Sequence, residues 1–170
     1  MPTYIGQAKL HNALVNRWAN GGLSTLFESY WAEDAIGEYT VLNDGEAGPN
    51  QPWPYCVYVL SESKPTIRMT GPENQNWEVR DTSLEFHIFA LAIGSEGAKE
   101  VAARLAERVM ARFGGHPTEH PAPVEVVGGD ILIMKFMGEF GVRAEKSGSE
   151  EEWKWIVKYQ IRQDVQSASY

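Results

Sequence analysis

The stretch Trp77-Glu-Val-Arg-Asp-Thr-Ser-Leu-Glu-Phe-His-Ile-Phe-Ala-Leu-Ala-Ile93 decides the fold of this chain. Apolar residues alternate along it, which predicts one long β-strand; on one face they are Leu84, Phe86, Ile88, Ala90 and Ala92. The opposite face is polar at Ser83, Glu85 and His87 and becomes apolar from Phe89 onward. We therefore expect the strand to begin near solvent and to end in the core.

A single amphipathic helix is predicted after the break at Gly94-Ser95. Its apolar residues recur at helical spacing and form one stripe; they are Ala98, Val101, Ala102, Leu105, Val109 and Phe113. Charged residues such as Lys99, Arg104 and Arg108 occupy the other side. We expect Ser95 to cap the start of this helix and Gly114 to close its end in the left-handed conformation.

Further elements are predicted on both sides of this strand–helix unit. Helices are expected over Ile5–Asn20 and, more briefly, from Leu23 to Trp31, and strands over residues 38–42, 55–60, 124–127, 131–137 and 153–162. Gly128-Gly129-Asp130 reads as a tight turn, and residues 140–144 can extend the preceding strand past a glycine bulge. The order predicts an α+β fold, a mainly antiparallel β-sheet with two or three helices packed on one face. We expect one domain over residues 1–170, with a flexible C-terminal end from about residue 164.

Composition narrows the class of function. The 15 basic and 23 acidic residues give a net charge of −8, which argues against a general nucleic-acid binder or a protein that docks on anionic membranes. The lone Cys56 excludes an internal disulfide bond and suits a reducing compartment. Neither a signal peptide nor a membrane span is apparent, so we expect a protein made in soluble form inside the cell.

Three groups of residues are candidates for a catalytic or metal-binding site. Cys56 can act as a nucleophile with His87 as its base, but both lie in predicted strands, where a buried structural cysteine is the commoner outcome. Glu85 and His87 share a strand face as a possible acid–base pair or as exposed cross-strand partners. His116 and His120 have a metal-ligand spacing, which Pro117 removes from any regular helix. We therefore expect no catalytic residues, no metal and no cofactor.

Aromatic residues beside flexible segments are the remaining feature. Trp53 lies between two prolines, and Trp77 follows Asn-Gln-Asn. Tyr55 and Met69 are close to these tryptophans in the sequence. Exposed aromatics are enriched at protein interfaces. These four residues are our candidates for a protein interface, with the alternative that each tryptophan folds back on its own sheet.

The order of features resembles that of the bacteriophage tail-terminator and head–tail joining (neck, tail-completion) proteins. The likeness spans roughly residues 5 to 163 and is carried by an N-terminal helix, a proline-rich approach to a "PY" strand, the central strand with its helix, and a closing strand; these are residues 8–18, 54–59, 84–90 with 98–113, and 159–162. Residues 23–42 and 116–123 have no counterpart in it.

The resemblance implies a structural virion protein of a tailed phage, without catalytic residues. Copies of such a protein assemble into a ring, commonly six-fold, that ends tail-tube growth or joins tail to head. Its partners would be itself, the tail-tube protein and the head–tail connector proteins, with DNA only passing through the lumen and no membrane. Two alternatives stand beside it, a small-ligand-binding module or minor enzyme with a pocket between sheet and helices, and an adaptor that binds one protein partner.

Overall fold

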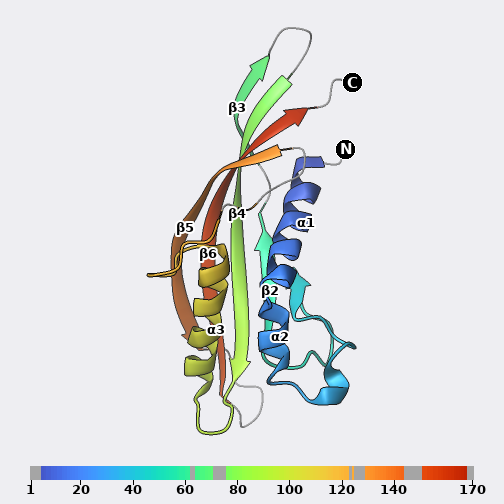
Figure 1. Ribbon diagram of the computed structural model, residues 1–170, viewed down its shortest axis with the longest axis vertical. Helices are drawn as coiled ribbons and strands as arrows, with labels where there is room; N and C mark the ends of the chain where they lie inside the picture. The colour runs from blue at the N-terminus through green and yellow to red at the C-terminus, as the bar shows by residue number, and fades with distance from the viewer. Residues whose placement is uncertain are drawn as a thin grey trace.

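The fold is seen in a computed structural model (Figure 1), which describes residues 5–61, 64–70, 76–122, 124, 129–143 and 151–167. For residues 5–7, 67–70, 76–77, 129–132 and 164–167 it describes the backbone alone. The helical elements are α1 (Ile5–Asn20), α2 (Leu23–Glu28), the 3-10 helix η1 (Glu33–Ala35) and α3 (Ala98–Phe113). The strands are β1 (Leu42–Asp44), β2 (Tyr55–Leu60), β3 (Lys64–Thr70), β4 (Asn76–Leu91), β5 (Gly129–Arg143) and β6 (Glu152–Ser167).

The strands form one sheet in the order β1-β2-β4-β6-β5. Only β1 and β2 pair in parallel, and every other pair is antiparallel. β2 and β3 follow one another along the same edge of β4, opposite residues 84–89 and 76–81 respectively. Near β3, the paired strands extend past the helices at one end of the molecule (Figure 1). The predicted α+β fold with a mainly antiparallel sheet is confirmed.

Phe86 in β4 is the centre of the core between sheet and helices. Its ring lies 5.7 Å from that of Trp18 in α1, 4.8 Å from that of Phe113 in α3 and 6.1 Å from that of Tyr159 in β6. All four side chains are buried. The alternating apolar face of the long strand therefore packs against both long helices, and the predicted stripe of α3 is the face that is buried.

Two arginines join the C-terminal ends of α1 and α3. Arg17 Nε donates to the backbone oxygen of Arg112, and Arg112 Nε donates to that of Arg17, both at 3.1 Å. These oxygens belong to the last turns of their helices, where carbonyls lack an intrahelical partner. Each guanidinium thus caps the other helix. Burial, together with the charge of Arg112, lowers the pKa of Arg17.

The ends of α3 differ from the prediction. Gly97, in an extended conformation, is the N-cap, and Ser95 lies in the turn before it, so the predicted Ser95 cap is wrong. Gly114 has a positive φ of 122° but a ψ of 159°, which is not the left-handed helical conformation. Its N–H still donates to the oxygen of Met110 at 2.7 Å and ends the helix.

Several strand boundaries also differ. The expected strand over residues 38–42 is wrong, because regular pairing begins only at Leu42. Gly129 and Asp130 belong to β5 and not to a tight turn, and β5 continues past a bulge between Phe136 and Gly138 to Arg143. The extension past a glycine bulge is thereby confirmed as far as Arg143. The strand predicted over residues 124–127 falls, except for Val124, outside the described residues.

One strand was not predicted at all, and another is longer than predicted. β3 was not predicted, since Pro65 and the charged residues around it break the apolar alternation. β6 continues to Ser167, five residues past the expected end, because its last residues pair with the start of β4. Pairing with a neighbour, and not apolar content, defines both segments.

Candidate interaction surface

One face of the sheet packs on the helices, and the opposite face, called here the outer face, has no helix on it in the described part of the chain. Alternation along the strands assigns each side chain to a face. On β4 the odd-numbered residues from Asp81 to Leu91 belong to the outer face, since the even-numbered ones lie in the core. Residues paired across neighbouring strands lie on the same face of the sheet. The pairing therefore identifies the residues of the outer face in β2, β6 and β5 as well.

An aromatic cluster occupies the end of the outer face nearest the C-terminus of β4. The rings of Tyr55 and Phe89 are stacked, with centroids 4.8 Å apart and an interplanar angle of 13°. Trp53 meets both rings edge-on, at 5.0 Å from Tyr55 and 6.0 Å from Phe89. The indole of Trp31 donates to the oxygen of Pro54 at 2.9 Å and anchors the loop that carries Trp53. All three cluster residues are half-buried.

Hydrophobic side chains continue across the middle of the outer face. Val57, His87, Ile156 and Phe140 stand in one row across β2, β4, β6 and β5. Val57 and Ile156 are buried, although neither belongs to the core cluster between sheet and helices. Their neighbours on the outer face itself shield them, so this face holds a small apolar layer of its own.

Charged residues surround this layer. His87 Nε2 and Lys158 Nζ lie 2.8 Å and 3.4 Å from the two carboxylate oxygens of Glu85. Burial alone would raise the pKa of Glu85, but these two hydrogen bonds outweigh it and hold the pKa below its usual range. Farther along, Arg162 donates two hydrogen bonds to Asp81, at 2.9 and 3.0 Å, and these lower the pKa of Asp81.

Exposed hydrophobic side chains concentrate on and beside the outer face. Six large ones in the described residues are 39–53% exposed. Four belong to the outer face by register, namely Val59, Ile133, Phe140 and Val142, and Met137 is the extra residue of the β5 bulge. Such side chains scattered singly need no explanation, whereas a group of them on one uncovered face indicates a contact surface.

The four predicted interface residues do not lie together. Trp53 and Tyr55 belong to the aromatic cluster, folded onto their own sheet and still half-exposed. Met69 and Trp77 are paired opposite one another in β3 and β4, and their side chains lie outside the described part of the structure. Trp77 and Phe89 are twelve positions apart in one strand, which is about 40 Å at the usual rise per residue. The candidates thus form two pairs at opposite ends of β4.

Phe89, Phe140 and Val142 were not predicted as surface residues. Phe89 was expected to lie in the core, because its side of β4 becomes apolar toward the end of the strand. That expectation is wrong: Phe89 is half-buried under Trp53 and not under a second layer. One pattern in the sequence could have indicated this surface. The outer side of β4 becomes apolar toward the end of the strand, and alternate residues in the last part of β5 are apolar as well.

Of the three candidate groups for chemistry, only Glu85 and His87 are in contact, within the charged residues described above. Cys56 is buried on the core face, opposite Ile88, whereas His87 belongs to the outer face. Burial also raises the pKa of the Cys56 thiol well above its usual value, so these two residues cannot form a nucleophile and base. His116 Nδ1 instead accepts hydrogen bonds from the backbone N–H groups of Thr118 and Glu119, each at 3.2 Å.

In the ranges that the structure describes, no three His, Cys, Asp or Glu side chains are grouped in a way that could hold a metal ion. No helix among them has the length and apolar character needed to cross a membrane.

No protein-family model matches the sequence, and no curated protein matches it either. Among solved structures, a chain from the virion of a native gene transfer agent (GTA) particle matches with a TM-score of 0.49 and 16% sequence identity. The match covers 97% of this chain and 100% of that one. A likeness at this level does not establish a common function.

Proposed function

We propose that this protein is a structural component of a tailed-phage virion, which self-associates into a ring at the end of the tail tube or at the head–tail interface. The observation that carries the proposal is the outer face, where exposed hydrophobic side chains lie on a sheet that no helix of the described chain covers. Buried in a contact between copies, these side chains are removed from water. The order of elements that resembles tail-completion proteins supplies the virion context.

The shape of the sheet favours head-to-tail contacts. The strand order runs from the short β1 at one edge to the 15-residue β5 at the other. In this proposal the β1 edge of one copy meets the β5 side of the next, and such a heterologous contact can close into a ring. In this proposal the ring is six-fold, as the resemblance implies, and its partners are the tail-tube and head–tail connector proteins.

The charge of the chain is compatible with this role. A net charge of −8 suits the wall of a lumen past which DNA moves without binding. No step of the proposed function requires a catalytic residue, a metal or a cofactor. A ring with a strongly basic lumen would contradict this part of the proposal.

Disruption of the gene within its phage or prophage tests the proposal. We expect unjoined heads and tails, or tails of uncontrolled length, when particles are counted by negative-stain electron microscopy. Expression of the wild-type chain from a second locus restores normal particles and serves as the control. Normal particles after disruption, together with the absence of the protein from purified virions by mass spectrometry, would overturn the proposal.

A further inference from the structure

The outer face of β5 and β6 carries an apolar patch flanked by two lysines. Phe140 lies opposite Ile156, and Val142 lies opposite Lys154 in the next row. Lys158 lies on the other side of the row of Phe140 and Ile156, and its Nζ stands 5.2 Å from the centroid of the Phe140 ring. Phe140 and Val142 are 43% and 39% exposed. These five residues are called the β5–β6 patch.

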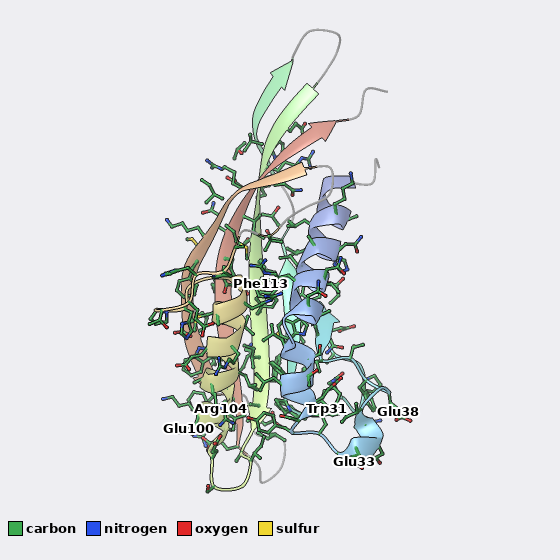
Figure 2. The ribbon with its side chains drawn as sticks, in the orientation of Figure 1. Trp31, Glu33, Glu38, Glu100, Arg104 and Phe113 are labelled. Atoms are coloured by element: carbon green, nitrogen blue, oxygen red, sulfur yellow. The ribbon has the colours of Figure 1, made fainter. Side chains whose placement is uncertain are left out.

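The opposite edge of the molecule carries a surface of opposite charge. Residues 18–63 contain seven Asp and Glu residues and no Lys or Arg. Five of these carboxylates are exposed within residues 33–46, called the acidic segment; they are Glu33, Asp34, Glu38, Asp44 and Glu46. Within the described chain none of the five has an ion-pair partner. Glu33 and Glu38 are seen at the corner of the molecule in Figure 2.

The acidic segment also holds a hydrophobic side chain. Ile36 is 47% exposed and is the one large exposed hydrophobic of the described residues that does not lie in β2 or β5. It stands between Asp34 and Glu38, just past η1. The segment therefore presents an apolar side chain flanked in sequence by exposed carboxylates, and the β5–β6 patch presents apolar side chains flanked by ammonium groups.

We propose that the β5–β6 patch of one copy binds the acidic segment of a second copy of this chain. Burial of Ile36 against Phe140 removes apolar surface from water, and Lys154, together with Lys158, which also contacts Glu85 of its own chain, offsets carboxylates that lack ion-pair partners. One chain cannot make this contact with itself, because the acidic segment adjoins β1 and the patch lies on β5 and β6, at the two edges of the sheet (Figure 1). The inference rests on the proposed self-association and names the surfaces that make it.

Charge reversal of each surface tests the contact. One variant carries Lys154→Glu with Lys158→Glu, and the other carries Glu33→Lys with Glu38→Lys. Each variant alone brings like charges together, so we expect its self-association, measured by sedimentation velocity in low salt, to weaken at least about tenfold. Mixed in equal amounts, the two variants regain complementary surfaces and are expected to co-assemble to the mass of the wild-type assembly.

Controls separate this contact from other effects of charge. Lys99→Glu with Arg108→Glu makes the same change in net charge on the exposed face of α3 and is expected to leave the assembly intact. Chemical denaturation verifies that each variant is folded, and added salt is expected to weaken the wild-type association.

Three results would overturn the inference. They are a wild-type chain that stays monomeric at the highest concentration reached in low salt, reversed variants that keep the wild-type mass, and reversed variants that dissociate but fail to co-assemble. The second result would mean that copies associate elsewhere, with the acidic segment free to face a lumen. None of the three results tests the proposed virion role, which the particle experiment tests separately. Failure of the proposed contact and failure of the proposed function are therefore distinguishable.

Discussion

Tyr159 shows how a single side chain secures the junction between sheet and helix. Its ring packs against Phe86 and Phe136, and its hydroxyl donates to the oxygen of Gly114, 2.7 Å away, just past the end of α3. Burial raises the pKa of this hydroxyl far above its usual value. A buried hydrogen bond at a helix end stabilises the fold because the carbonyl has no partner within the helix.

Replacement of this tyrosine tests that contribution. Tyr159→Phe is expected to lower the free energy of unfolding by about 1–2 kcal/mol, since it leaves the Gly114 carbonyl without its partner. Urea denaturation followed by tryptophan fluorescence measures the change. Tyr39→Phe is the matched control, because its half-buried hydroxyl makes no hydrogen bond within the described chain. Equal effects of the two substitutions would contradict this role for Tyr159.

At the scale of an element, β5 is bent by a bulge and fitted to its neighbour by a glycine. A Cβ on Gly141 would lie 2.6 Å from a ring carbon of Trp155. The indole of Trp155 covers this glycine and donates to Glu139 at 2.8 Å. The bulge between Phe136 and Gly138 shifts the alternation by one residue, which places Phe140 and Val142 on the outer face.

A methyl group at Gly141 is expected to displace Trp155. Gly141→Ala should cost about 1–3 kcal/mol of stability, as overpacking of a fitted site does. The shift of the midpoint of thermal unfolding measures the loss. Gly48→Ala serves as the control, because its added Cβ would meet nothing within 4 Å. A variant as stable as the wild type would show that Trp155 moves aside freely.

At the scale of the whole molecule, the described residues form a two-layer structure, with helices on one face of the sheet and no helix on the other. The core cluster lies entirely between the sheet and the helices. Among the described residues, the aromatic cluster covers one end of the outer face, and the exposed hydrophobic side chains on it are available for contact with another molecule. This asymmetry is the physical reason to seek the function of the protein at that face.

The role of the outer face can be separated from stability. Phe140→Ser removes a ring that is 43% exposed and lies beside Ile156, so we expect a smaller loss in the free energy of unfolding than at a core position but a clear loss of self-association. Light scattering coupled to size-exclusion chromatography gives the mass. Glu107→Ser, on the exposed face of α3, is expected to leave the mass unchanged. A Phe140→Ser variant that keeps the wild-type mass would exclude this ring from the contact.

The sequence by itself determined the elements whose signal is local. The alternation in β4 and the helical spacing in α3 predicted both elements and the face of each that packs into the core, because each period repeats within the segment. The start of α3 and the burial of the Phe89 side of β4 were predicted wrongly. The burial of Cys56 was expected because cysteine is among the most commonly buried residues, and the structure confirms it. β3 and the last residues of β6 escaped prediction, since their pairing partners, and not their own composition, make them strands.

Tertiary structure alone decided which residues share the outer face. Cross-strand register sets His87 between Val57 and Ile156, and the bulge in β5 sets Phe140 opposite Ile156. It also separated Trp53 and Tyr55 from Met69 and Trp77, which the sequence had grouped as one candidate surface. Register and layer order depend on contacts between distant segments, and a linear pattern carries no record of them.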